Sequence, residues 1–300
     1  MENCKLLSEY INGNYKERLF SDGTKIRFSN DDEFHPEFPE SIDLKITNRC
    51  DLRCLMCHEK STPNGKNADL NNLFFNTLNK GTELAIGGGN PLDHKDLVPF
   101  LQRMKEQGVI CNITINQLHL IKNKLLIQQL IDEELVYGIG VSISKDLFLD
   151  EIIDFSNKNT NTVIHVIAGV IDIKILEKLY DNDLKLLVLG YKTVGRGIDY
   201  YSKIVEENIL YIEKNIMDIS KHFSIVSFDN LSIKQLKMEE KVEDFNMLYM
   251  GDDGEFTMYI DLVKKEFAIS SISDKRFKIK DDIKQMFKKI QQEKINERNL

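Results

Sequence analysis

Three cysteines, Cys50, Cys54 and Cys57, lie within eight residues in the segment Cys-Asp-Leu-Arg-Cys-Leu-Met-Cys. Three thiolates on one short loop can ligate three irons of a cubic iron–sulfur cluster. The fourth iron then has no protein ligand, and a metal with an open position can bind and activate a small molecule. The spacing therefore predicts a reactive metal centre rather than a structural one.

Three other interpretations of this segment are possible. The stretch from Cys54 to His58 matches the C-x-x-C-H pattern of haem attachment, but that chemistry needs export, and the first residues contain no export signal. Zinc could use His58 as its fourth ligand, although adjacent Cys57 and His58 would have difficulty reaching one tetrahedral ion. The cysteines could also be buried hydrophobic residues, which their polar neighbours disfavour. We prefer the cluster.

Composition narrows the class of protein. The chain has 300 residues, a formal net charge of −8 and 42% hydrophobic residues, enough for a substantial core. We expect no nucleic-acid partner because no basic field covers the chain, and no membrane partner because no apolar run reaches transmembrane length. Five cysteines, three of them crowded, indicate metal binding in a cytoplasmic protein rather than a disulfide framework.

The elements that must position the cysteines follow a regular alternation. Strand-like runs cover 42–47, 83–86, 109–115, 137–143, 163–170, 185–189 and 223–228, and helical patterns cover 71–79, 94–107, 122–134, 146–157, 173–180 and 201–222. Such alternation predicts an α/β fold with a parallel sheet, a partial (β/α)6 TIM-like barrel, whose working face lies at the carboxyl ends of the strands. The cysteines directly follow the first of these strands.

Two flanking segments complete the predicted organisation. Residues 1–40 are expected to form a short N-terminal β-hairpin, with strands at 15–20 and 24–28, and a linker. Residues 41–230 form the barrel. Residues 231–300 form a small α+β cap, with a hairpin over 256–262 and 266–270 and a helix over 281–295. The apolar stripe of that helix comprises Ile283, Met286, Phe287 and Ile290.

The cysteine spacing after a first barrel strand resembles the radical S-adenosylmethionine (radical SAM) superfamily. The resemblance covers about residues 41–230 and implies two cofactors, a [4Fe–4S] cluster and S-adenosyl-L-methionine (SAM). It implies that Cys50, Cys54 and Cys57 hold the cluster and that the open iron chelates the methionine part of SAM. Met56 stands where the family usually has an aromatic residue before the third cysteine. The resemblance also implies sensitivity to oxygen.

A glycine run ends the second strand, in the segment Leu-Ala-Ile-Gly-Gly-Gly-Asn-Pro that ends at Pro91. Glycines at a strand end let a ligand approach the backbone closely. Gly88, Gly89, Asn90 and Pro91 resemble the Gly-Gly-Glu-Pro segment with which the family holds the amino group of SAM. Here Asn90 replaces the acid, so an uncharged amide oxygen would accept from the ammonium group.

Further strand ends match the family's SAM pocket, although each could also be an ordinary strand end. Asn116, Ser142 and Ser144 are candidates to bind the ribose and carboxylate of SAM. Ile167, Gly169 and Leu189 are candidates to border the adenine.

The groups expected to touch substrate are Lys192, Arg196 and His58. Two glycines flank Arg196, which predicts a mobile loop presenting donors to a carboxylate or phosphate, although a solvated basic loop is an equal alternative. His58 adjoins the third cysteine. His165, which alternates with apolar residues, is expected to be a core histidine.

The predicted function is reductive cleavage of SAM to a 5′-deoxyadenosyl radical that abstracts hydrogen from a small-molecule substrate. The alternative substrate is a peptide or protein side chain, and the alternative class is a sensor that binds cluster and SAM without turnover. An electron donor such as flavodoxin or ferredoxin is expected. The last 26 residues, with nine Lys and Arg against four Asp and Glu, are a candidate docking surface for it, although a structural helix with a solvated face is preferred.

Overall fold

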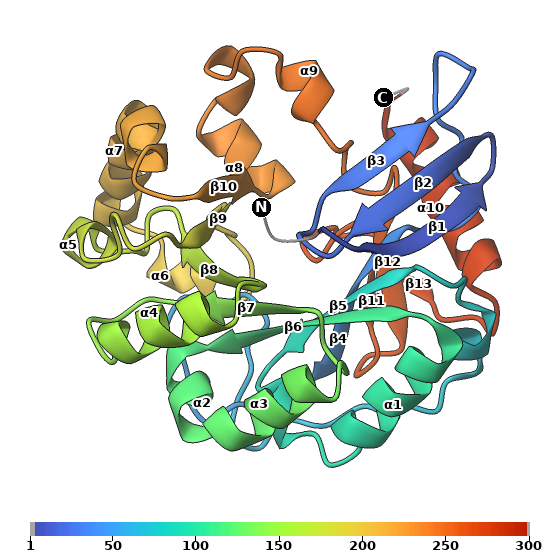
Figure 1. Ribbon diagram of the computed structural model, residues 1–300, viewed down its shortest axis with the longest axis horizontal. Coiled ribbons are helices and arrows are strands. Elements are labelled where there is room, and N and C mark those ends of the chain that lie inside the picture. Colours follow the sequence, from blue (N-terminus) through green and yellow to red (C-terminus); the bar gives the residue numbers. More distant parts are fainter. Residues whose placement is uncertain (1–3, 299–300) are drawn as a thin grey trace.

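The computed structural model describes residues 4–298, so the outer ends of the first and last predicted segments, residues 1–3 and 299–300, lie outside it. Its main sheet has ten strands in the order β10-β9-β8-β7-β6-β5-β4-β11-β12-β13, and a separate sheet has the order β1-β2-β3 (Figure 1). The pairings from β10 to β11 are parallel, and those of β12 are antiparallel. The fold is therefore mixed α/β with a mostly parallel sheet.

The seven predicted parallel strands are confirmed. They are β4 (Ser41–Thr47), β5 (Glu83–Gly88), β6 (Ile110–Asn116), β7 (Gly138–Ser142), β8 (Thr162–Ile167), β9 (Lys185–Leu189) and β10 (Ile225–Phe228). Side chains alternate between faces along a strand. In β4, Ile42, Leu44 and Ile46 belong to the hydrophobic core, and Asp43 and Lys45 lie on the opposite face. The strands were found in the sequence because this alternation is local.

Helices α1, α2, α3 and α4 lie along one side of the main sheet (Figure 1). The helices that follow the parallel strands are η1 (Leu73–Thr77), η2 (Pro91–Asp93), α1 (Leu97–Gln107), α2 (Gln117–Lys122), α3 (Lys124–Asp132), α4 (Leu149–Lys158), α5 (Ile173–Glu177), α6 (Gly197–Tyr200) and α7 (Lys203–Ser220). Helix α1 buries Leu97, Phe100, Leu101 and Met104 and ends at Gly108, whose φ of 76° is left-handed. No helix within residues 4–298 is long and apolar enough to cross a membrane.

The N-terminal sheet contains a strand that the sequence did not predict. β2 (Tyr15–Phe20) and β3 (Lys25–Phe28) confirm the expected hairpin, and β1 (Leu6–Asn12) pairs with β2. Residues of β1, β2 and the β2–β3 turn line a cavity of about 490 Å³ together with residues near the amino ends of β5 to β10. This sheet therefore covers the main sheet away from the carboxyl ends of its parallel strands.

The C-terminal segment extends the main sheet. After α8 (Asn230–Gln235), η3 (Met238–Glu240) and α9 (Phe245–Leu248), β11 (Thr257–Asp261) and β12 (Glu266–Ala268) form the predicted hairpin, with β13 (Phe277–Lys278) beside it. β11 also pairs in parallel with β4, placing Tyr259 beside Asp43 and Asp261 beside Lys45. In α10 (Ile283–Arg298) the predicted stripe is buried, with each side chain at most 1% exposed.

Candidate functional site

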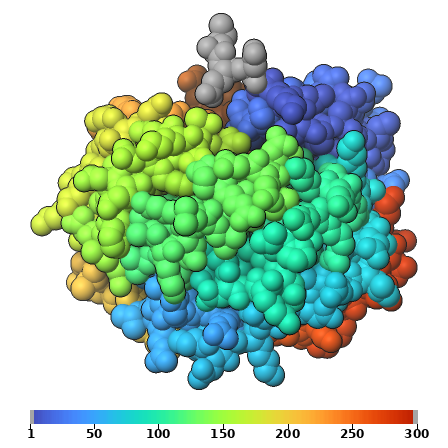
Figure 2. Space-filling model, turned by 60° about the horizontal axis from the view of Figure 1, so that its bottom comes forward, coloured from blue at the N-terminus to red at the C-terminus, as the bar shows by residue number. Residues whose placement is uncertain are grey.

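The cysteine loop comprises residues 48–66, which follow β4. The end of the loop, residues 62–66, lies beside its beginning, residues 48–50. The amide of Cys50 donates to the Thr62 carbonyl at 2.9 Å, and the amide of Asn48 donates to the Lys66 carbonyl at 2.9 Å. Thr62 donates back to the Asn48 carbonyl at 3.0 Å. The segment around residue 50, in light blue, lies at the lower edge of the molecular surface (Figure 2). The loop is thus both braced and accessible.

The three cysteines fit a cluster better than a single metal ion. All three are free and half-buried, unlike the buried core residue Cys111. Their sulfur atoms are not gathered within 4.8 Å of one another. Ligands of one tetrahedral zinc, with Zn–S near 2.3 Å, would lie about 3.8 Å apart. Burial raises the pKa of the Cys50 and Cys54 thiols, and neighbouring cysteines add to that rise. The donor set therefore suits several metal atoms.

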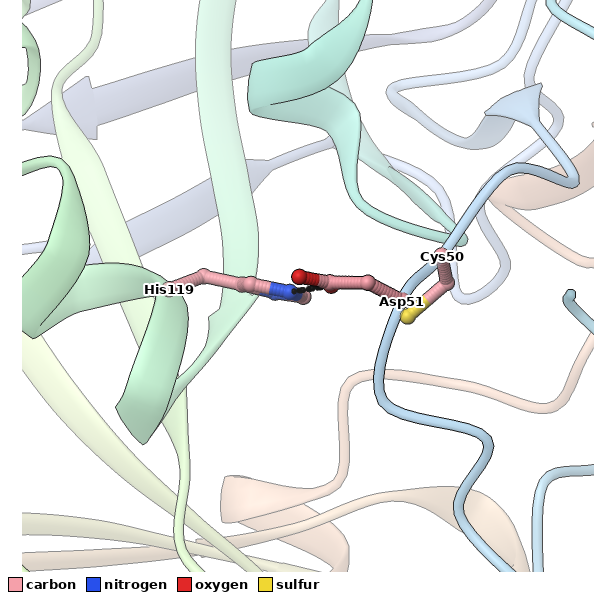
Figure 3. A group of neighbouring side chains, drawn as sticks. All are labelled: Cys50, Asp51 and His119. Atoms are coloured by element: carbon pink, nitrogen blue, oxygen red, sulfur yellow. Dashed lines mark hydrogen bonds and ion pairs between the residues drawn. The ribbon is translucent and has the colours of Figure 1, made fainter. Parts of the chain in front are cut away.

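A buried histidine ties the cysteine loop to the rest of the sheet. His119 of α2 places Nε2 2.7 Å from Oδ1 of Asp51, and Cys50 lies beside this pair (Figure 3). The His119 hydrogen bond lowers the pKa of Asp51, and burial opposes this shift. Sequence reasoning missed His119 because nothing local links it to a loop 68 residues earlier.

The glycine run packs against the cysteine loop. The amide of Gly89 donates to the Thr47 carbonyl at 2.8 Å, and that of Asn90 donates to the Arg49 carbonyl at 2.7 Å. A Cβ added to Gly88 would lie 2.4 Å from the Thr47 carbonyl oxygen, and one on Gly89 would lie 2.1 Å from that of Arg49. Gly88 also has a φ of 112°. These two glycines let the two loops touch, whereas a Cβ on Gly87 would meet open space.

Asn90 is buried at the start of η2, which begins with Pro91. Its Oδ1 accepts from the Leu92 amide at 3.3 Å. Its Nδ2 is buried without a hydrogen-bond partner among the described residues. The sequence-based hypothesis used the amide oxygen to bind an ammonium group. In the structure the oxygen already caps η2, and the free capacity on the nitrogen suits a ligand acceptor such as a carboxylate.

The weaker candidates lie at the carboxyl ends of adjacent strands, and several have structural partners. Asn116 caps α2 by accepting from Leu118, and the Ser144 amide donates to the buried Gln117 side chain at 2.9 Å. Gly169 has a φ of 86° and lies close to α7. Ser142, Ile167 and Leu189 are the last residues of β7, β8 and β9. All therefore belong to the edge that carries the cysteine loop.

The loop after β9 packs on the cysteine loop instead of moving freely. Arg196 donates from Nε to the Cys54 carbonyl at 2.9 Å and from Nη1 to the Ser61 carbonyl at 3.0 Å. A Cβ on Gly195 would lie 2.1 Å from the His58 carbonyl oxygen. The mobile loop expected from the two glycines is therefore replaced by a close contact. This contact commits two of the Arg196 nitrogens to holding the cysteines and leaves Nη2 buried without a partner in the described chain.

A charged network, which we call the Glu59 network, follows the third cysteine. Glu59 forms an ion pair with Lys45 of β4, accepts from the Tyr259 hydroxyl of β11 at 3.0 Å and lies 3.4 Å from His58 Nε2. Lys45 also contacts Asp261 at 3.1 Å. Burial opposes ionisation of Glu59, but His58 and Lys45 hold the pKa of its carboxyl well below the usual value. Burial lowers the pKa of His58, against the opposing effect of Glu59.

A cavity of about 570 Å³ adjoins this network and includes His58, Glu59, Tyr259 and Arg276 in its wall. Lys192, a predicted substrate group, donates to the Ser271 hydroxyl at 2.9 Å, and Ser271 also lines the cavity. A volume of this size suits a small ligand. His58 thus lines this cavity, Lys192 reaches its wall through Ser271, and Arg196 is turned towards the cysteine loop.

His165 differs from its expected role. It lines the 490 Å³ cavity, and a Cβ on Gly140 would lie 2.2 Å from its ring. Burial lowers the pKa of His165 to about 4, so the ring is neutral near pH 7. The apolar alternation in β8 identified the strand, but it did not show that His165 faces a space rather than the core.

Comparisons with known proteins agree with this arrangement. No family model matches the chain. A curated relative from Methanococcus vannielii, named "Probable GTP 3',8-cyclase", is 30% identical over 122 residues, which are 38% of this chain and 39% of that protein. The chain therefore matches only about two fifths of that relative's length.

The fold resembles that of SuiB from Streptococcus suis. The structure of SuiB bound to S-adenosylmethionine has a TM-score of 0.60 and 13% identity, covering 93% of this chain and 85% of that chain. SuiB bound to its precursor peptide SuiA has a TM-score of 0.51 and 16% identity, covering 77% and 59%. The cysteine motif and the partial likeness to the cyclase both agree with the resemblance to the radical SAM superfamily.

Proposed function

We propose that this chain is a radical SAM enzyme that holds one [4Fe–4S] cluster on Cys50, Cys54 and Cys57. The observation that carries the proposal is the three free thiols on one braced loop, at the carboxyl edge of a parallel sheet beside the open space at Gly87. When bound, the cluster supplies the electron that cleaves SAM to the 5′-deoxyadenosyl radical, which abstracts hydrogen from substrate. In this proposal the parallel strands form a partial (β/α)6 barrel, 41–230, between the flanking segments 1–40 and 231–300.

In this proposal the residues of the chain bind SAM and the substrate and orient them towards the cluster. Asn90, with its unpartnered nitrogen, and the opening beside Gly87 receive the methionine part of SAM. Met56, Gly88, Gly89, Pro91, Asn116, Ser142 and Ser144 surround it, and Ile167, Gly169 and Leu189 border the adenine. Arg196, His119 and the Glu59 network hold the cysteine loop in place. Lys192 and His58 face the substrate.

The first candidate substrate is a small molecule, which the likeness to a GTP cyclase supports. The second is a peptide side chain, which the likeness to SuiB in its peptide complex supports. A cytoplasmic flavodoxin or ferredoxin would supply the electron. In α10, Lys284 pairs with Glu37 at 3.3 Å, which leaves the exposed Lys288 as the more available contact for such a donor.

Anaerobic reconstitution tests the proposal. We expect about four irons and four sulfides per chain, and 5′-deoxyadenosine in excess of the protein after reduction with SAM. Cys54→Ala should abolish both, whereas Cys4→Ala, which removes an exposed free thiol, should change neither. One zinc per chain without acid-labile sulfide would contradict the cluster. Cluster and SAM binding without 5′-deoxyadenosine would instead support the sensor.

A further inference from the structure

Two cations converge on Ser271, in the wall of the 570 Å³ cavity. Lys192 donates from Nζ to the Ser271 hydroxyl at 2.9 Å, and Arg276 donates from Nη2 to the Ser271 carbonyl at 2.7 Å. Among the side chains that the structure describes, those of residues 4–296, neither cation has a carboxylate oxygen within 4.0 Å. Both cations contact the same residue, and like charges repel each other unless an anion lies near both. The carboxylate of Asp43 acts on Lys192 only from beyond ion-pair distance.

Of the four carboxylates that line the cavity, three pair with other cations, and Asp274 is exposed and has no cation within 4.0 Å among the described side chains. Glu59 and Asp261 both pair with Lys45, whose side chain is 3% exposed, and Glu266 pairs with Lys278. Arg276 is also held in place, because its guanidinium lies 5.2 Å from the centre of the Tyr259 ring. At the rim, Lys60 and Lys264 are exposed and add positive charge without an ion pair in the described chain.

We propose that Lys192 and Arg276 form a binding site for an anionic group of the substrate, a carboxylate or a phosphate. This inference rests on the proposed function, since the cavity wall includes His58 and Glu59, which directly follow Cys57. A guanidinium can bind either anion with two parallel hydrogen bonds, and the ammonium of Lys192 would add a charge-assisted bond. The anion would anchor one end of the substrate while the rest reaches towards the cysteine loop.

Calorimetric titration of the reconstituted protein with inorganic phosphate and, separately, with succinate tests the site. We expect saturable binding of at least one of them, and the preferred anion distinguishes phosphate from carboxylate. Arg276→Gln and Lys192→Gln should each weaken binding by about tenfold or more, the scale of one charge-assisted hydrogen bond. Lys192→Arg should retain binding. Lys280→Gln, an exposed change just before α10, should have no effect.

The same titration with saturating SAM distinguishes this site from that of the cofactor. Unchanged anion binding supports a substrate site, whereas displacement by SAM would overturn it. Absence of saturable binding, or equal binding by folded Arg276→Gln protein with a normal melting curve, would also overturn it. 5′-Deoxyadenosine is measured on the same preparation. If 5′-deoxyadenosine forms but no anion binds, only the anion site is refuted. If an anion binds but no 5′-deoxyadenosine forms, only the proposed enzyme activity is refuted.

Discussion

Two buried ion networks lie near opposite ends of β4, and they differ in what surrounds them. Before its start, Glu40 accepts from Arg27 at 2.7 and 2.8 Å and from the Tyr15 hydroxyl at 2.6 Å, and Phe256 packs against the Arg27 guanidinium at 3.6 Å. Near its other end, Lys45 belongs to the Glu59 network, beside the 570 Å³ cavity.

The comparison shows that a buried ion network can join two sheets at one end of β4 and position the cysteine loop at the other. Both carboxylate oxygens of Glu40 are bound by groups of the N-terminal sheet, so this network joins that sheet to β4. Glu59 is also fully paired, but its neighbours Tyr259 and His58 border open space and the cysteine loop. A buried ion pair is weak evidence for stability alone, so its surroundings decide its role.

The largest expected effect is on folding. Arg27→Met and Lys45→Met should each lower the free energy of unfolding by about 3–5 kcal/mol, because each leaves a buried carboxylate without its main cation. Denaturation by urea measures this. Arg18→Met, which removes a half-exposed pair with Glu9, should cost less than about 1 kcal/mol.

These two variants should differ in iron loading. At a temperature where both are folded, we expect Arg27→Met to load iron normally and Lys45→Met to load poorly. Equal loading would show that the two networks do not differ in role.

A pH dependence tests the network around Glu40 further, because Lys25 lies 3.4 Å from Glu40 and 3.9 Å from the buried Glu17. Burial raises the pKa of Glu17 to about 7, against the opposing charge of Lys25. The folded state therefore keeps a proton that the unfolded chain loses near pH 4.5, and stability falls as pH rises from about 4.5 to beyond 7. Glu17→Gln should remove this loss and gain about 3 kcal/mol at pH 8, with little change at pH 4. Urea denaturation at pH 4 and pH 8 measures this gain in the free energy of unfolding. A gain that does not grow with pH would refute the raised pKa of Glu17.

A smaller effect on folding is expected within the Glu59 network. Glu59→Gln keeps an acceptor for Tyr259 but loses the charge-assisted bond to Lys45, at about 1–2 kcal/mol of unfolding free energy. Because Glu59 anchors the residues after Cys57, iron content after reconstitution should also fall. Glu266→Gln, which removes the pair with the exposed Lys278, is the matched control and should leave iron content unchanged.

The smallest effect concerns Asn90. Asn90→Ala removes one uncharged amide, so SAM binding to the reconstituted protein should weaken by about 1 kcal/mol. Equilibrium dialysis measures the affinity. Unchanged affinity would remove this residue from the SAM site, while cluster content should stay the same in either case.

The parts of the molecule that the sequence predicted are those encoded locally. The parallel strands and the α10 stripe follow from alternation and helical spacing, and the cysteine loop follows from three residues within eight. The contacts that hold the loop join distant residues, such as Tyr259 and Glu59, which are 200 positions apart. No local pattern reports such pairs. The pairing of β11 with β4 was missed for the same reason.

The glycines illustrate a second limit of what can be predicted from the sequence. Gly88, Gly89 and Gly195 were each interpreted as openings for a ligand or as sources of mobility. In the structure each lets one loop touch the backbone of the cysteine loop. The sequence correctly indicated a close approach, but not whether a ligand or the chain itself approaches.

The position of β11 has a consequence for the order in which this molecule can be made. β4 emerges early during synthesis, but its neighbour β11 begins only at Thr257. Until then one edge of β4 is unpaired, and Lys45 and Glu59 lack the partners that β11 provides. The cysteine loop is therefore translated long before the contacts from β11 can form. A nascent chain that has not reached β11 would offer the cell's iron–sulfur delivery machinery a cysteine loop without those contacts.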